Sequence, residues 1–211
     1  MNRHPSSVIA DLRALMPSRP LENHEAEGVA ERQAKRFLEI FEITDPGVDV
    51  GLIAELPRIR VRVAPSLPES GLTYWDRGVW VIGVNRDDSR TRRRFTLAHE
   101  FKHILDHPFI DRIYGDTSGK PSDKRAELLC DHFAACLLMP RPWVKRLWTQ
   151  ETQDVRVLAA TFNVSPAAMS LRLQHLGLVE QHRRWRVSEE SPVRHYFRDA
   201  PVQAMAISTA G

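Results

Sequence analysis

The chain has few cysteines. Among 211 residues only Cys130 and Cys136 could form a disulfide. If both lie on one helix, they stand about 240° apart around its axis with ~9 Å of rise, which is too far for a bridge. We therefore expect two buried thiols in a reducing compartment, and the predicted location is cytoplasmic.

Long apolar runs are also missing. No segment approaches the ~20 apolar residues that a membrane-spanning helix needs. Residues 1–20 hold three prolines but lack the apolar stretch of roughly 7 to 15 residues found in secretion signals. We expect no membrane partner and no export. The sequence also has no internal repeat, which excludes solenoids and other repeat architectures.

The composition that remains is that of a globular protein with one domain, or one domain and a small appendage. Hydrophobic residues make up 42% of the chain and charged residues 27%, which is enough apolar material for a core. The net charge of +3 permits contact with nucleic acid without arguing for it. The densest cluster of positive charge, Arg90 to Arg94, is either a solvated helix start or a patch facing a substrate or polyanion.

The spacing of apolar residues changes along the chain. Steps of three and four predict a helix from Glu22 to Ile43, and Asp49 is a candidate N-cap for a short helix ending at Pro57. Strict alternation then begins in "RIRVRVA", followed by "GLTYW" and "GVWVIGVN", which a turn across 76–78 would join. We predict an α+β fold with a small, mostly antiparallel sheet before helical periodicity resumes near Thr91.

The stretch "FTLAHEFKHILDH" carries the most specific chemistry in the sequence. On a helix, His99 and His103 lie one turn apart on the same face, so both imidazoles can reach one tetrahedral zinc ion. Glu100 lies about 100° around the helix, where it can flank the metal and act as a general base. The pentad supplies two ligands and a base, but it lacks a third ligand.

His107 and Glu127 are the candidates for this third ligand. A straight helix separates His99 from His107 by ~12 Å, and the residues that follow lack the glycine and histidine of the metzincin pattern. Glu127 lies on a later apolar helix, "SDKRAELLCDHFAACLLMP", where an uncompensated carboxylate would be costly to bury. We favour Glu127 as ligand over a surface role pairing with Lys124 or Arg125. Asp131, one turn further on, could hydrogen-bond a ligand histidine.

The sequence resembles the ImmA/IrrE family of bacterial and phage metallopeptidases. The resemblance rests on "RRFTLAHEFKHILDH" followed by "ELLCDHFAACLLMP", because that family has an F-T-x-A-H-E-x-x-H helix before an E-x-x-A-N-x-F-A-x-x-L-L-M-P helix. Its leading glutamate corresponds to Glu127, while Cys130 and Asp131 stand where alanine and asparagine are usual. An acid four residues after the ligand also resembles thermolysin-like gluzincins, consistent with a supporting role for Asp131.

The resemblance implies a zincin-like minimal metallopeptidase with its sheet packed on the active-site helix. It implies Zn²⁺, although two histidines and a carboxylate also suit Mn²⁺ or Fe²⁺. The implied substrate is a protein, often a co-encoded helix-turn-helix repressor of stress or mobile-element genes. Cleavage would use Glu100 as base, with an extended substrate adding to a sheet edge that we expect to be "GVWVIGVN". Tyr74, Tyr114, His107 and His175 stay open as candidates to stabilise the oxyanion.

We predict four parts: a flexible arm over 1–20, the peptidase domain over 21–148, a helix-turn-helix-like segment over 149–180 and a weakly ordered tail over 181–211. The third part, "VRVLAATFNVSPAAMSLRLQHLGLV", raises the competing hypothesis of a DNA- or repressor-binding regulator with a non-catalytic metal site. Its candidate reading residues are Arg172, Gln174 and His175, but its leucines favour packing or partner docking. A further alternative is an interaction protein with a vestigial site.

Overall fold

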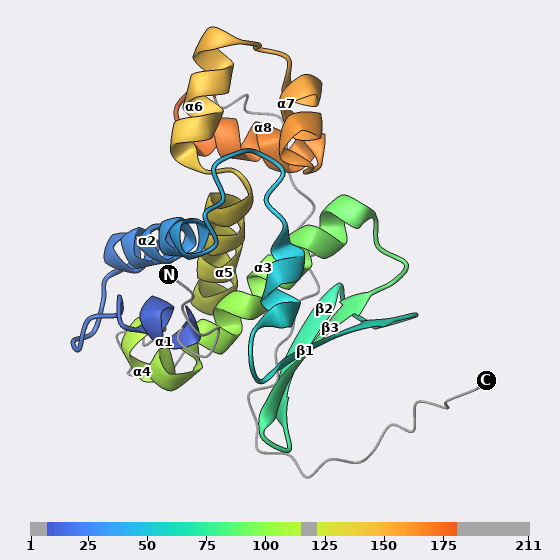
Figure 1. Ribbon diagram of the computed structural model, residues 1–211. Helices are drawn as coiled ribbons and strands as arrows, with labels where there is room; N and C mark the ends of the chain where they lie inside the picture. The colour runs from blue at the N-terminus through green and yellow to red at the C-terminus, as the bar shows by residue number, and fades with distance from the viewer. Residues whose placement is uncertain (1–7, 115–121, 181–211) are drawn as a thin grey trace.

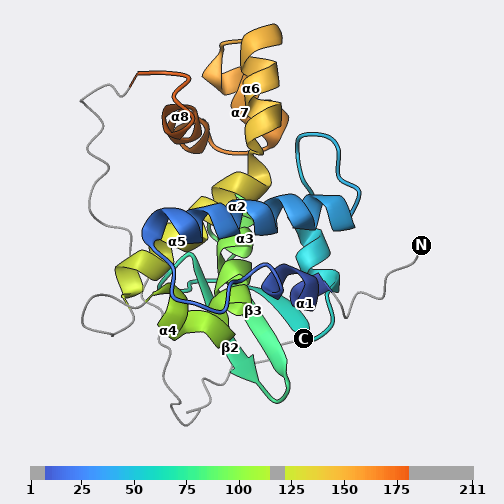
Figure 2. The ribbon, with the colours of Figure 1, turned by 90° about the vertical axis from the view of Figure 1, so that its left-hand side faces the viewer.

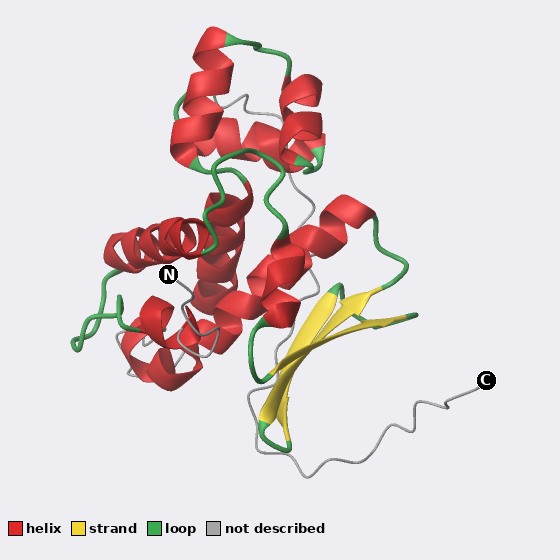
Figure 3. Ribbon diagram, in the orientation of Figure 1, coloured by secondary structure: helices red, strands yellow, loops and turns green. Residues whose placement is uncertain are grey.

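The computed structural model describes residues 8–114 and 122–180, and its fold is α+β (Figures 1 and 3). The strands are β1 (Ile59–Ala64), β2 (Gly71–Asp76) and β3 (Val79–Asn85). The α-helices are α1 (Val8–Arg13), α2 (Asn23–Ile40), α3 (Arg90–Asp106), α4 (Ile110–Ile113), α5 (Asp123–Leu138), α6 (Arg141–Gln150), α7 (Val155–Phe162) and α8 (Pro166–His175). Two short 3₁₀ segments, η2 (Val50–Glu55) and η3 (His107–Phe109), connect them.

Helix α3 lies in the middle of the molecule. The sheet packs on one side of it, while α5 and, behind α5, α2 cover the other (Figure 1). Every residue from Thr96 to Asp106 is buried. A helix buried all round needs internal partners for its polar side chains, and α3 carries two histidines, a glutamate, a lysine and an aspartate in that stretch.

The sheet is mixed, with strand order β1-β3-β2. β2 and β3 form the predicted antiparallel hairpin, and Arg77 and Gly78, at φ 46° and 88°, make the two-residue turn. β1 pairs with β3 in parallel, so the prediction of a mostly antiparallel sheet is corrected for this strand. β3, expected at an edge, is the central strand, because β1 pairs with the side of β3 that the hairpin leaves free and not with β2.

Local capping signals explain most of the helix starts. Asp49 accepts a hydrogen bond from the backbone N–H of Gly51 at 2.8 Å, as predicted, although η2 is a 3₁₀ rather than an α-helix. Ser122 caps α5 and Ser165 caps α8, each accepting from a backbone N–H three residues on. Gly177, at φ 67°, follows α8 as predicted. Ser89 caps α3 in the same way, accepting from the backbone N–H of Arg92. Ser89 and Ser122 therefore set where the two helices that carry the candidate site begin.

Residues 8–13 of the predicted arm are helical. They form α1, whose Val8 and Leu12 are buried in the core because their apolar side chains face α2 and α3. The Arg13 side chain donates to the carbonyl oxygens of Ile104 and Leu105, at 2.6 and 3.3 Å, which ties α1 to the end of α3. Residues 1–7 lie outside the described part of the chain.

Helices α6, α7 and α8 group together beyond the end of α5 in both views (Figures 1 and 2). Pro140 separates α5 from α6, and α6 packs on α7, so the boundary that we predict at 148 falls inside α6. The predicted tail over 181–211 and the loop over 115–121 lie outside the described residues. Among those described, no helix is long and apolar enough to cross a membrane.

Candidate metal centre

The imidazoles of His99 and His103 converge on α3. Their Nε2 atoms are 3.2 Å apart, and the two rings are 5% and 1% exposed by residue. The four-residue spacing on one helix face produces this approach, as the sequence predicts. Two aromatic nitrogens this close in the interior are suited to share one cation.

Glu127 reaches the same two nitrogens from α5. Its Oε2 lies 3.3 Å from His99 Nε2 and its Oε1 lies 3.5 Å from His103 Nε2. With bonds of ~2.0–2.1 Å, a tetrahedral zinc ion separates neighbouring ligand atoms by about 3.4 Å. The Nε2–Nε2 distance of 3.2 Å matches this spacing, and the two oxygens of Glu127 face one histidine each, at 3.3 and 3.5 Å, so the carboxylate is placed to complete a cation site with the pair.

Asp131 lies on α5, as Glu127 does, and orients His99. Its Oδ1 lies 2.8 Å from His99 Nδ1, and since a carboxylate can only accept, the Nδ1–H of His99 donates. This hydrogen bond fixes the tautomer and leaves the Nε2 lone pair aimed at Glu127 and His103. Glu127 and Asp131 are thus brought to the two predicted positions by one turn of α5.

The charge around His99 is strongly negative. Burial alone lowers the pKa of His99, but hydrogen bonds to Asp131 and Glu127, together with the charge of Glu100, outweigh it and raise this pKa to about 10. The carboxylates around the ring therefore stabilise a positive charge at this position. That is the electrostatic setting that a bound dication requires.

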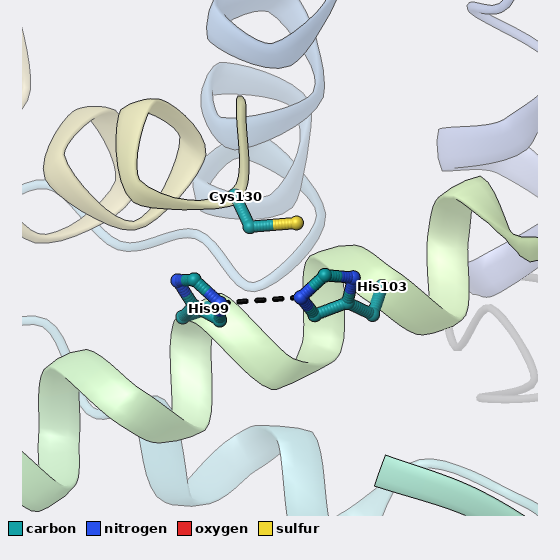
Figure 4. A group of neighbouring side chains, drawn as sticks. All are labelled: His99, His103 and Cys130. Atoms are coloured by element: carbon teal, nitrogen blue, oxygen red, sulfur yellow. Dashed lines mark hydrogen bonds between the residues drawn. The ribbon is translucent and has the colours of Figure 1, made fainter. Parts of the chain in front are cut away.

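Cys130 is a neighbour of the pair that the sequence did not single out as a ligand. Figure 4 shows it on α5, facing His99 and His103 on α3, and its Sγ lies within 4.8 Å of a ring nitrogen of each. Burial raises the pKa of the Cys130 thiol well above its usual value, with Asp106 adding to the effect. The sequence signal was available, because Cys130 follows Glu127 by three residues and shares its helix face.

Glu100 lies beside the pair, where α3 meets β2. It is 1% exposed, and the Thr73 hydroxyl donates to its Oε2 at 2.7 Å. The next helix position after His99 points this carboxylate toward the sheet rather than toward α5. A buried carboxylate next to a cation site can take and return a proton.

The remaining predicted candidates lie elsewhere. The His107 ring, in η3, packs edge-on against Trp80 with 4.9 Å between centroids, beside the sheet. Tyr114 is buried, and its hydroxyl donates to Asp106 at 2.5 Å, so it is already engaged. Tyr74 is on β2, in the strand position next to Thr73 and therefore on the opposite face of the sheet. His175 ends α8.

The arrangement is that of a zincin-like metalloprotein: α3 carries the histidine pair and a flanking glutamate, and α5 adds a second glutamate beside the pair. The family model described as the IrrE N-terminal-like domain, Peptidase M78, matches residues 54–174, which is more than half of the chain. The chain belongs to this family. The predicted resemblance to ImmA/IrrE proteins is thereby confirmed.

Curated relatives carry the same family name. The chain is 35% identical over 82 residues to the radiation response metalloprotease IrrE of Deinococcus deserti, covering 37% of this chain and 29% of that protein. It is 30% identical over 118 residues to the protein of that name from Deinococcus radiodurans, covering 54% and 35%. The matched part spans about a third of the length of these relatives.

A solved structure shares the fold. It is described as a Mycobacterium tuberculosis transcriptional regulator and superposes with a TM-score of 0.53 at 19% identity, covering 83% of this chain and 53% of that chain. Similarity at this level of identity concerns the fold alone. It agrees with the α+β architecture of a small sheet packed on the central helix.

Proposed function

We propose that the chain is a zinc-dependent endopeptidase acting on a protein substrate. The observation that carries the proposal is the approach of the Glu127 carboxylate to both imidazoles: its two oxygens lie 3.3 and 3.5 Å from the Nε2 atoms of His99 and His103, which are 3.2 Å apart. The buried carboxylate of Glu100 lies next to them. These three side chains would hold the ion, and Asp131 would keep His99 in its ligand tautomer. Membership of a family with curated metalloproteases supports a metal and hydrolysis in general.

A divalent ion bound there supplies a Lewis acid that polarises the scissile carbonyl and acidifies water. The chain's own contribution is proton transfer. Glu100 takes a proton from the attacking water and gives it to the amine that leaves. Two histidines and one carboxylate are also compatible with Mn²⁺ or Fe²⁺.

The substrate would bind along β2. This strand is an edge of the described sheet and runs beside Glu100, so an extended peptide can add to it through backbone hydrogen bonds. Trp75 shares the sheet face of Thr73 and is 51% exposed, which offers an apolar contact for a substrate side chain. We propose a co-encoded helix-turn-helix repressor as substrate, with the cytoplasm as the location.

The competing DNA-binding hypothesis loses its main reading residue. Arg172 is 4% exposed, and its Nε donates to the Met139 carbonyl oxygen at 3.1 Å. Of the other two candidates, His175 is exposed and Gln174 is partly exposed, but the remaining exposed positions of α8, Pro166, Ala167 and Leu171, have no side chain that binds phosphate. The α7–α8 segment therefore supports packing and partner docking better than base recognition.

The test is cleavage of the co-encoded repressor by the purified, zinc-loaded chain. Fragments appear with wild type, and Glu100→Gln, which preserves the shape of the side chain, binds the repressor and the metal without cutting. Equal cleavage by both proteins would remove Glu100 from the mechanism. Binding without cleavage by wild type, at one equivalent of metal, would favour the regulatory alternative with a non-catalytic site.

A further inference from the structure

Thr73, on β2, donates a hydrogen bond to the proposed general base, Glu100. The Thr73 hydroxyl, on β2, lies 2.7 Å from Glu100 Oε2 and 3.4 Å from the Glu100 carbonyl oxygen. A hydroxyl has one hydrogen to donate, and the shorter contact to a charged acceptor is the stronger one. We propose that Thr73 is a positioning residue for Glu100, an inference that rests on the proposed function of Glu100 as the base.

Gly71 provides the close approach that this contact requires. A Cβ at Gly71 would lie 2.3 Å from Thr96 Cγ2 and 2.8 Å from Glu100 Oε1, both far inside van der Waals contact. Gly71 and Thr73 are two residues apart, so they share one face of the strand, the face toward α3. One residue clears space for the carboxylate and the next residue on that face donates to it.

The arrangement restricts the carboxylate in two ways. The hydroxyl fixes the rotation of the carboxyl plane through Oε2, while the backbone of Gly71 borders the side of Oε1. Hydrogen bonds to an ionised group are shorter and stronger than those between neutral groups, so this contact favours one orientation of the carboxylate. A base that must take a proton and return it benefits from such restriction, because both transfers depend on distances near hydrogen-bond length.

β2 is also the edge strand on which the substrate would add. Base and substrate would therefore be registered by the same six-residue strand, Gly71–Asp76. A shift of β2 along α3 would move the bound peptide relative to the metal ligands and would break the hydrogen bond from Thr73 to the base. β2 would therefore align both the substrate and the base, although it contributes no metal ligand.

Matched substitutions separate the hydrogen bond from packing. Thr73→Val keeps the shape and removes the donor, whereas Thr73→Ser keeps the donor and removes a methyl group. Thr161→Val, on the exposed surface of α7, makes the same chemical change at a hydroxyl bonded only to the Val157 carbonyl oxygen in the described structure. The probe is acetohydroxamic acid, a small chelator that needs an open metal position and shares its proton with a neighbouring carboxylate. Its dissociation constant is read from the visible spectrum of the cobalt-loaded full chain, without any peptide substrate.

Thr73→Val is expected to weaken acetohydroxamate binding by roughly threefold to tenfold. This is less than the full value of a hydrogen bond to a charged group, because other contacts still hold the carboxylate of Glu100 in part. Thr73→Ser and Thr161→Val are expected to bind acetohydroxamate within about twofold of wild type, because both keep the hydrogen bond to Glu100. All variants are expected to hold one equivalent of cobalt. Wild-type affinity in Thr73→Val overturns the proposal. Loss of cobalt or of folding in Thr73→Val, or no rescue by serine, would make Thr73 structural instead. Cobalt binding by wild type without any acetohydroxamate binding overturns both the proposed function and the positioning role, because the site would then have no open position beside Glu100.

Discussion

Asp131 Oδ1 and His99 Nδ1 are 2.8 Å apart, which makes the carboxylate the acceptor that fixes the ring of His99. The side chain of Asp131 is 56% exposed, whereas that of His99 is 7% exposed. The contact thus joins a solvent-facing side chain of α5 to a buried imidazole of α3. Asp131 is four residues after Glu127, so one helix supplies both the carboxylate that faces the two imidazoles and the acceptor that orients His99.

Asp131→Ala is expected to lower zinc affinity by about 10- to 100-fold, because the His99 ring loses the partner that selects its tautomer. The measurement is zinc competition against a chelator of known affinity. Asp131→Asn keeps an acceptor oxygen and should lose much less. Unchanged affinity in Asp131→Ala would mean that His99 is oriented by other contacts.

Glu127→Ala is expected to abolish tight binding of one metal equivalent, and Cys130→Ala to leave it intact. Glu127 contacts both histidine nitrogens within 3.5 Å, whereas the Cys130 thiol is buried and its pKa is raised by burial. Metal analysis after dialysis gives the stoichiometry of each variant. The near-ultraviolet spectrum of the cobalt-loaded chain provides the complementary check: an intense thiolate-to-cobalt band that vanishes in Cys130→Ala would make Cys130 a ligand.

Lys102→Ala is expected to destabilise the fold by about 3–5 kcal/mol, since it leaves the carboxylate of Asp106 buried without its cation. Lys102 and Asp106 are both fully buried and 2.5 Å apart, and Lys102 also donates to Gln33 Oε1 at 2.9 Å. Urea denaturation measures the loss. Lys35→Ala is the matched control, because Lys35 and Glu39 form an ion pair with the same four-residue spacing on an exposed helix face. Its expected effect is within about 0.5 kcal/mol, and equal losses in the two variants would contradict the assigned role of burial.

Arg172→Ala is expected to lower stability by about 1–3 kcal/mol, because it removes the donor to the buried Met139 carbonyl oxygen. Denaturation of this variant is compared with that of Arg156→Ala, which changes an exposed arginine on α7. Any weak, salt-dependent binding to DNA should be no more sensitive to Arg172 than to Arg156. Selective loss of promoter binding in a stable Arg172→Ala protein would restore the reading role.

Sequence periodicity was sufficient for the parts of the fold that depend on neighbours along the chain. Helix α3, its histidine pair and the caps at Asp49, Ser122 and Ser165 follow from spacing and side-chain chemistry. Glu127 and Asp131 could be predicted because a four-residue interval on an apolar helix puts two acids on one face. The grouping of both motifs at one place follows the family pattern.

Contacts between distant segments could not be predicted in this way. Alternation identifies β1 and β3 as strands but contains no information on whether they pair in parallel or which one is central. The Thr73–Glu100 hydrogen bond spans 27 residues and depends on that strand order. The burial of Arg172, one of the candidate reading residues, could not be predicted for the same reason, because its partner, Met139, belongs to the connection between α5 and α6.

The Lys102–Asp106 pair has a consequence for how α3 is seated. Gln33 on α2 and Tyr114 after α4 complete the polar contacts of the pair, so each charged atom has its partner at one position of the helix only. Rotating α3 by one residue, or sliding it by one turn, would strand an ionised group in an apolar interior, at a cost of several kcal/mol. The pair therefore fixes a single register of α3 against its neighbours. Because His99 and His103 lie on the same helix, this register also determines the direction in which both imidazoles point.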